Sequence, residues 1–322
     1  MYSKHSYFLP LFFSLICISA LSAQVVINEY SCANLDQYVD NYQNHEDWVE
    51  LYNPGDTTVF LAGWYMSDDD KNPTKWAFPT AVKITAKGYL SVWCSGRNVS
   101  SVAAGQIHTN FRLTQSKSKA EHIILATPAG LVIQDIKVEK TQVRQSRGRF
   151  PDGSEEWRIF KKASRKSSNN NAFGYTNFAE RPDMDMAAGF YNGAITVTVT
   201  NKEPNSVLRY TTDGTEPNIS SPLYTAPITI GQTTVLKAAA FSNDTFVLPS
   251  FVQYNTYFIN DKPSLWVVSV AAAQLTDLAN GDKALTPWGS IEIFGVDGDR
   301  KTRAYGSLNS HGQDSWANDQ RS

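Results

Sequence analysis

The histidines of the chain are the first residues to examine for chemistry. Four stand beyond the N-terminal segment, and they are far apart in the sequence: His45, His108, His122 and His311. None belongs to an H-E-x-x-H zinc motif, and the chain has no C-x-x-C pair, no G-x-S-x-G nucleophile turn and no phosphate-binding glycine loop. These patterns therefore predict no catalytic, cofactor-binding or metal-binding residue, and no cofactor.

Two acidic runs carry side chains that could share a cation. The His-Glu-Asp run at residues 45–47 could reach a metal from one loop. Adjacent residues near a strand point to opposite sides, however, which favours polar residues that cap the next strand. The three aspartates at residues 68–70 offer oxygen ligands for Ca²⁺, but the run lacks the loop spacing of a site with six or more ligands. We predict a solvated turn there.

Two other residue classes have both a chemical and a structural interpretation. Paired carboxylates could hydrolyse a glycosidic bond, but nothing in the sequence singles out one pair. Eight tryptophans could stack on sugar rings. On the strands of small sandwiches such rings more often fill the core, and we favour that interpretation. The tryptophans are Trp48, Trp64, Trp76, Trp93, Trp157, Trp266, Trp288 and Trp316.

The N-terminal residues 1–23 have the pattern of a secretory signal peptide. Lys4 supplies the positive charge, Phe8–Ile18 is mostly apolar, and small residues precede a cleavage point after Ala23. The apolar run is shorter than the roughly 20 residues of a membrane span, which favours cleavage over an N-terminal anchor. We predict a secreted or cell-surface protein with no transmembrane span after cleavage.

Cleavage would leave two cysteines, Cys32 and Cys94. An oxidising compartment would permit a disulfide between them. The alternative is two buried free thiols that act as small hydrophobic side chains. We slightly favour the free thiols, because a chain of about 300 residues needs no covalent staple.

Composition excludes several classes of protein. The chain has 322 residues, a formal net charge of −2 and 42% hydrophobic residues. A nucleic-acid-binding protein would show a positive excess, and a disordered acidic chain would lack the apolar content. One segment departs from this average, because residues 137–166 carry ten basic and four acidic residues, a net charge of +6. A polyanion-binding patch is one interpretation, and we favour a solvated edge that leads into a linker at 166–171.

The order of turns and apolar alternation predicts many short strands. In residues 47–52, Trp48, Glu50 and Tyr52 share one face while Val49 and Leu51 share the other. Such strands separated by turn residues are typical of β-sandwiches. The other strands that we predict are Val25–Tyr30, Thr57–Trp64, Tyr89–Cys94, His122–Thr127, Leu131–Val138, Ile195–Thr200, Val207–Thr211, Leu223–Ile230, Thr234–Phe241, Trp266–Val270 and Ile291–Phe294.

Residues 261–322 do not follow this all-β pattern. Ala271–Ala279 is a short helix candidate that ends at Asn280-Gly281. About 60 residues of mixed pattern are marginal as an independent core, so we expect an incomplete α+β segment. The fold class that we predict is mainly β, with two immunoglobulin-like sandwiches in tandem and this segment after them.

The first module, residues 24–172 with a linker to about 182, contains a set of recognisable segments: Val26–Tyr30, Asp47–Pro54, Leu61–Trp64, Lys75–Pro79 and Arg147–Ser154. In these segments it resembles the lamin-tail domain family. The resemblance implies an immunoglobulin-like sandwich that accompanies other domains in secreted bacterial proteins, with no catalytic residues to carry over.

The second module, residues 183–260, contains its own set of recognisable segments: Gly189–Tyr191, Ile195–Val199, Arg209–Pro217 and Ser221–Tyr224. In these segments it resembles the C-terminal domain of chitobiase and β-hexosaminidase. The resemblance implies a small immunoglobulin-like sandwich that is an accessory fold in glycosidases and not the hydrolytic domain.

The third segment contains a partial set of matching residues: Pro263–Val270, Ser290–Phe294, Asp297, Gly298, His311–Trp316 and Gln320–Ser322. In these residues it is similar to the opening of spore-coat CotH-type proteins, which have an atypical kinase-like fold. That family usually has Lys where Arg321 stands, and its later acidic metal-binding residues are absent here, so phosphotransfer is not assigned. The three modules in this order resemble a large exported protein of Bacteroidetes-type bacteria.

Three functional hypotheses follow. The leading one is an exported cell-surface protein whose sandwiches are non-catalytic binding, adhesion or spacer modules for a cell-surface protein or a glycan, with no nucleic-acid partner. The second is an ectoenzyme whose CotH-type kinase-like domain is completed beyond residue 322. The third, an accessory protein for polysaccharide binding or degradation, is weaker because it depends on the chitobiase-type module alone, and fold does not imply function.

Overall fold

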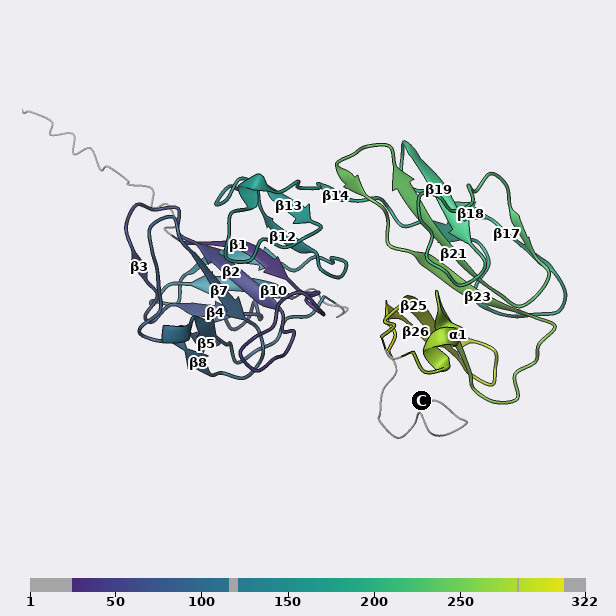
Figure 1. The fold of residues 1–322 in the computed structure, drawn as a ribbon, viewed down its shortest axis with the longest axis horizontal. Helices are drawn as coiled ribbons and strands as arrows, with labels where there is room; N and C mark the ends of the chain where they lie inside the picture. The colour runs from purple at the N-terminus through teal and green to yellow at the C-terminus, as the bar shows by residue number, and fades with distance from the viewer. Residues whose placement is uncertain (1–24, 116–120, 283, 310–322) are drawn as a thin grey trace, which may run out of the picture. The chain divides into compact units, whose positions relative to one another are not determined.

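The computed structural model describes residues 25–115, 121–282 and 284–309, drawn as a ribbon in Figure 1. The chain divides into two compact units between residues 172 and 173. In the described ranges both units are built from short strands, with one short α-helix in the second. The prediction of a mainly β protein is confirmed. The predicted signal segment, residues 1–23, lies outside the described residues.

The first unit is a sandwich of two antiparallel sheets. The larger sheet has the strand order β13-β12-β1-β2-β7, and the smaller has the order β11-β10-β4-β5. The larger sheet consists of β1 (Val26–Ser31), β2 (Trp48–Tyr52), β7 (Tyr89–Trp93), β12 (Ser146–Arg149) and β13 (Trp157–Phe160). The smaller sheet consists of β4 (Tyr65–Ser67), β5 (Trp76–Ala77), β10 (His122–Ala126) and β11 (Val132–Lys137). Two short pairs complete the unit: β3 (Val59–Phe60) with β6 (Lys83–Ile84), and β8 (Ser100–Ser101) with β9 (Gln106–Ile107).

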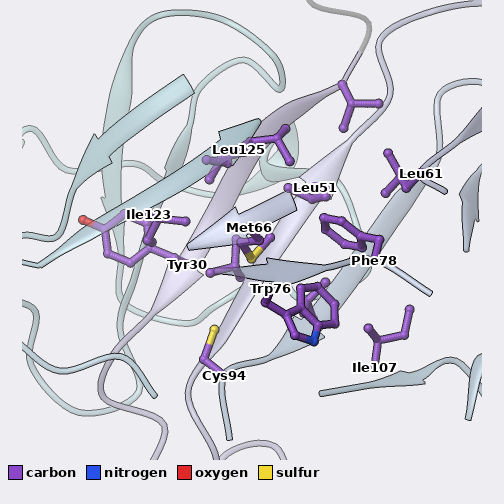
Figure 2. Close-up of a cluster of buried hydrophobic side chains, with 14 of the residues drawn as sticks. Tyr30, Leu51, Leu61, Met66, Trp76, Phe78, Cys94, Ile107, Ile123 and Leu125 are labelled. Carbon is purple, nitrogen blue, oxygen red and sulfur yellow. The ribbon is translucent and has the colours of Figure 1, made fainter. Parts of the chain in front are cut away.

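The inner faces of the two sheets share one hydrophobic core. Tyr30 of β1 and Leu51 of β2 belong to the same buried cluster as Met66 of β4 and Ile123 of β10 (Figure 2). The alternation predicted for β2 is confirmed, because Val49 and Leu51 face this core. Each such side chain contributes about 1.5–3 kcal/mol through burial, so the core accounts for the pairing of the two sheets.

The opposite face of the larger sheet is also covered. Trp48 of β2 and Trp93 of β7 are fully buried there, in a small cluster with Ala163 and the ring of Tyr38. Ala163 belongs to residues 161–172, which we call the strap. Both faces of this sheet are therefore inside the unit.

The sequence-based prediction of a linker at residues 166–171 is wrong. Asn169 in this stretch is completely buried, and its side-chain amide donates to the carbonyl oxygen of Arg149 at 3.0 Å. A short 3₁₀ helix, Asn169–Asn171, begins at Ser168, whose hydroxyl accepts from the backbone N–H of Asn170 at 3.1 Å. Small polar residues suggest a linker by composition, but here their hydrogen bonds fasten the strap.

The second unit contains a further sandwich-like arrangement around the sheet β16-β23-β21-β19. Its inner face packs Leu236, Ala238 and Tyr257 against Val197 and Ile230 of the short pairs. The four strands are β16 (Gly189–Tyr191), β19 (Ser206–Thr211), β21 (Thr234–Ser242) and β23 (Gln253–Ile259). The short pairs are β14 (Asn177–Phe178) with β22 (Val247–Leu248), β15 (Asp183–Met184) with β18 (Val199–Thr200), and β17 (Ile195–Val197) with β20 (Ile228–Ile230).

Residues 267–307 cover the outer face of that sheet. A three-stranded sheet of β24 (Val267–Ala272), β25 (Trp288–Phe294) and β26 (Arg300–Ser307) lies beside β23 (Figure 1). Phe258 of β23 stacks on Phe190 and meets Phe294 edge-on, with centroid separations of 4.3 and 5.2 Å. The mixed α+β segment therefore packs on the second sandwich.

Three predicted elements are shorter or divided. The strand predicted over Thr57–Trp64 is only β3, because the chain turns at Gly63 with φ +77°. The strand predicted over Leu223–Ile230 is only β20, since Pro227 lacks the N–H that a ladder needs. The strand predicted over Ile195–Thr200 divides at Thr198 into β17 and β18, which join different partners.

The helix predicted over Ala271–Ala279 is also shorter. Ala271 and Ala272 end β24, and α1 spans only Leu275–Ala279. Gln274 separates the two elements with a left-handed φ of 56°. Strand pairing with β25 outweighs the helix propensity of the alanines.

Candidate functional site

Two glutamates face each other on the covered face of the larger sheet of the first unit. Glu29 of β1 is the register partner of Glu50 of β2, and Ser91 of β7 continues the same row. Both glutamates are completely buried. Opposed residues of an antiparallel pair have Cβ atoms about 4.5–5.5 Å apart, so the carboxyl groups share one polar site. We call Glu29 and Glu50 the carboxylate pair.

The strap supplies hydrogen-bond donors to the carboxylate pair. Ser164 donates its backbone N–H to Glu29 Oε1 at 3.0 Å and its hydroxyl to Oε2 at 2.8 Å. Ser146 donates its hydroxyl to the same carboxyl group at 2.5 Å, and the backbone N–H of Lys166 donates to Glu50 Oε2. Burial nevertheless raises the pKa of both carboxyl groups, and the neighbouring Glu29 raises the pKa of Glu50 further.

Arg165 brings a positive charge into this cluster from the strap. Its Nε donates to Ser91 Oγ at 2.7 Å, and its guanidinium carbon lies 3.9 Å from the ring centroid of Trp93. Burial lowers the pKa of Arg165 to about 10, while the charge of Glu50 opposes that shift. Glu50 Oε1 and Arg165 Nη2 are both buried without a hydrogen-bond partner in the described structure. The positive charge of Arg165 partly offsets the negative charge of Glu50.

The carboxylate pair is closed to substrates. Paired carboxyl groups with raised pKa values are the chemistry of glycoside hydrolysis, which also needs room for a sugar between them. Here the strap covers both groups, and neither has exposed surface. The cluster therefore fastens the strap to the sheet. The alternation of β2 predicts that Glu50 lies on the same face of the strand as Trp48. No sequence pattern predicts that Glu50 is opposite Glu29.

A second buried polar cluster surrounds His108. Its Nδ1 lies 2.9 Å from Ser95 Oγ, and its Nε2 lies 2.8 Å from Asn41 Oδ1. Asp40 Oδ2 is 4.0 Å from Nδ1. Burial lowers the pKa of His108, which favours the neutral imidazole. Ser95 and Asp40 approach the same ring nitrogen, Nδ1, and Asn41 contacts the other, Nε2. In a Ser-His-Asp triad the serine and the aspartate contact different ring nitrogens, so this cluster does not have the geometry of a catalytic triad.

The other candidate residues do not converge. His45 is exposed, Glu46 pairs with Arg112 at 2.9 Å, and burial raises the pKa of Asp47 to about 7. In the run at 68–70, Asp68 pairs with Lys75 at 2.7 Å. No three histidine, cysteine, aspartate or glutamate side chains gather as a metal site within the described ranges. His311 lies outside them.

The cysteines and most tryptophans are structural. Cys32 and Cys94 are free and buried, as the favoured prediction states, and burial raises the pKa of both thiols well above the ordinary value. The core interpretation is confirmed for Trp48, Trp76 and Trp93. It is wrong for Trp266, which is 62% exposed because it precedes the edge strand β24. Trp316 lies outside the described residues.

Ion pairs engage four arginines of the basic segment. Each of these arginines lies within 4 Å of a carboxylate, and Arg165 of the strap is half-buried beside Trp93 as described above. The segment continues into the strap and not into the predicted linker. The pairs are Arg144–Asp36, Arg147–Glu139, Arg149–Glu155 and Arg158–Glu156.

One open cavity lies on the first unit between β11 and the turn that follows β12. Its volume is about 550 Å³, and residues 133–136 form one wall while Val26, Pro54 and Gly153 form others. Arg149 also lines it, with a side chain only 3% exposed. Gln134 accepts the backbone N–H of Ile27 at 2.6 Å, at the bulge in β1. The cavity thus combines apolar walls, a buried cation and strand backbone.

Two families match this chain. Residues 19–140 match the Lamin Tail Domain, and residues 186–246 match the Chitobiase/beta-hexosaminidase C-terminal domain. Both resemblances drawn from the sequence are confirmed, and both imply the immunoglobulin-like sandwiches seen here. No curated protein matches the chain. The similarity to CotH-type proteins stays a prediction, and its stretches at 311–316 and 320–322 lie outside the described residues.

The long hydrophobic helix expected of a membrane-spanning protein does not occur in the residues that the structure describes.

Proposed function

We propose that this is an exported cell-surface protein whose two immunoglobulin-like modules bind and space other surface components without catalysis. The observation that carries the proposal is the match of both units to accessory-type domains; in the first of them the strap also closes the carboxylate pair to substrates. The rigid sandwiches leave their outer edges and loops for binding. The signal pattern of residues 1–23 supports export, and the order of modules supports a Bacteroidetes-type source.

We propose a glycan as the ligand class of the second unit. The matching family is named after chitobiase and β-hexosaminidase, which act on sugars. Phe173 and Phe246 stack with a centroid separation of 5.3 Å, and Tyr175 meets Phe173 edge-on at 4.9 Å. Phe173 and Phe246 are 55% and 48% exposed. Exposed ring faces of this kind stack on sugar rings, which supports an aromatic platform.

Export is tested by expressing the full chain with a C-terminal tag in a Gram-negative host. We expect removal of residues 1–23, detected as an N-terminal sequence that begins at Gln24. We also expect that treatment of intact cells with proteinase K removes the tag. The matched control lacks residues 1–23 and should stay protected inside the cell. A full chain that stays uncut in the cytoplasm would contradict the proposal.

Glycan binding is tested with the chain from residue 24 onward on a glycan array. We expect binding that falls at least about tenfold in Phe246→Ala, a loss that corresponds to about 1.4 kcal/mol. The control Ile219→Ala removes another exposed apolar side chain, which is 61% exposed, and should bind as the unmodified protein does. Absence of any glycan ligand, or equal loss in both variants, would contradict the glycan proposal.

The mixed α+β segment supports a second proposal, an ectoenzyme that begins a CotH-type kinase-like domain at about residue 261. Its support is that β24, β25, β26 and α1 follow two all-β modules as the resemblance implies. Saturable binding of a fluorescent ATP analogue to the full-length gene product would support it. A full-length product that binds no nucleotide would contradict it.

A further inference from the structure

β11 presents an unpaired backbone edge. Among the strands that the structure describes, it pairs only with β10. Just beyond the strand pair, Val138 donates its backbone N–H to the carbonyl oxygen of Glu121 at 2.8 Å. Because the register is regular, the backbone N–H and C=O of Ile136 and Gln134 also point toward β10. Along one strand of an antiparallel pair, the backbone N–H and C=O of successive residues point alternately toward the neighbouring strand and away from it. The backbone N–H and C=O of Asp135 therefore point away from β10.

The open cavity described above borders this edge. Four consecutive residues of β11, positions 133–136, line it. Successive side chains of a strand point to opposite faces, so only the backbone edge can bring four consecutive residues to one cavity. Leu131 and Val132 at the start of the edge are 65% and 41% exposed. An exposed apolar edge of this kind is a template for another strand.

Arg149 gives the cavity its charge preference. Its side chain is 3% exposed, and its Nε donates to the carbonyl oxygen of Ile27 at 2.8 Å. Its carboxylate partner is Glu155, at 3.5 Å and with a side chain 97% exposed. Solvent screens such a partner strongly, so the buried guanidinium is weakly neutralised. A ligand carboxylate in the cavity would form a stronger, charge-assisted pair.

We propose that β11 captures an extended peptide segment of a partner protein, which adds to the sheet as a strand and places a carboxylate against Arg149. Backbone hydrogen bonds to the edge supply affinity, and apolar side chains of the peptide meet Val26, Pro54 and Ile133. The carboxylate comes either from an acidic side chain or from the peptide's C-terminus. This binding surface on the first unit is independent of the glycan platform on the second.

The test measures fluorescence anisotropy of a labelled Thr-Val-Thr-Val-Thr-Asp peptide as the full chain is added. We expect saturable binding. Methylation of every internal peptide nitrogen should weaken it at least about tenfold, because the strand loses its donors. A peptide with C-terminal amide and a second with Asn in place of Asp distinguish the two carboxylate sources. If both of these peptides bind as tightly as the original peptide, the proposed pairing of a ligand carboxylate with Arg149 is wrong.

Two substitutions at one position test the edge from the protein side. Asp135→Pro removes the N–H that points away from β10 and keeps the ladder to β10, because edge strands tolerate proline there. We expect at least about tenfold weaker peptide binding. Asp135→Ala loses the same carboxylate but keeps the N–H, and it should bind within about twofold of the unmodified chain. No saturable binding, equal binding of the methylated peptide, or equal affinity of both variants would overturn the proposal.

Discussion

Two coverings, the strap in the first unit and the sheet β24-β25-β26 in the second, bury charged side chains, but these charges are neutralised differently. In the first unit, the strap gives the carboxylate pair neutral donors and one arginine. In the second, buried charges beneath or within the sheet β24-β25-β26 are held in pairs of opposite sign. Glu292, 1% exposed, accepts from Arg300 at 2.5 Å, and Lys237, completely buried, donates to Glu216 at 2.6 Å.

This difference separates two ways to bury a carboxylate. An ion pair inside a protein is costly to form but much costlier to break, because a lone buried charge remains. A buried carboxyl group that is not fully ion-paired can instead bind a proton, because burial raises its pKa, and its contribution to stability then depends on pH. The same glutamate-to-glutamine change should therefore have opposite signs in the two units. The predictions below test that comparison, from the largest effect to the smallest.

Glu292→Gln should destabilise the second unit by about 3 kcal/mol, because Arg300 is left without its counter-charge. Hydrogen exchange of β23 peptides in increasing denaturant measures this free energy of opening. Glu180→Gln, a change at an exposed glutamate, is the matched control. Protection equal to the unmodified chain would show that the ion pair contributes nothing.

Arg165→Met should destabilise the first unit by about 2 kcal/mol at pH 8, since the carboxylate pair loses the charge that balances it. The loss should be smaller at pH 5, where both carboxyl groups are closer to neutral. Urea unfolding followed by tryptophan fluorescence reports mainly on this unit, which holds five of the eight tryptophans. A loss that does not change with pH would mean that Arg165 acts only through packing on Trp93.

Glu29→Gln should stabilise the first unit by about 1 kcal/mol at pH 8 and have little effect at pH 5. The pKa of Glu29 is raised on folding, so its stabilising contribution is complete below about 4.5 and is lost as pH rises through the folded value. The comparison with the unmodified chain cancels the titrations of His108 and Asp47. Destabilisation at pH 8 would place Glu29 with the ion-paired carboxylates of the second unit.

Thiol labelling should detect the smallest of these differences. After Cys17→Ser, both remaining cysteines are buried in the first unit, so their alkylation reports its opening alone. At pH 8, Glu29→Gln should label about fivefold more slowly than the unmodified chain, as about 1 kcal/mol of added stability requires. Arg165→Met should label faster. Identical labelling rates for all three proteins would show that opening of the first unit does not depend on the carboxylate pair.

Local patterns predicted the strands well and their coverings poorly. The alternation of β2 places Val49 and Leu51 inward, and the structure agrees. That alternation also puts Glu50 on the other face, where a half-exposed sheet would leave it in solvent. Whether that face is covered depends on Ser164 and Lys166, which lie more than 100 residues away. Short-range periodicity carries no information on such contacts.

The candidate sites show the same limit. The acidic runs at 45–47 and 68–70 attract attention because their residues are adjacent, yet they separate in space. His108, Asp40 and Ser95 are distant in sequence and meet in the fold. The cavity beside β11 depends on a strand edge and on the turn after β12, so composition could not predict it.

The ionisation of the carboxylate pair tests the central comparison most directly. Carbon-13 NMR of a glutamate-labelled chain, with signals assigned through Glu29→Gln and Glu50→Gln, follows each carboxyl group across the pH range. We expect at least one of the two to titrate well above the ordinary value near 4.5 and to return toward that value when its neighbour is replaced. Two carboxyl groups that both titrate at or below 4.5 would show an ionised pair and contradict the account.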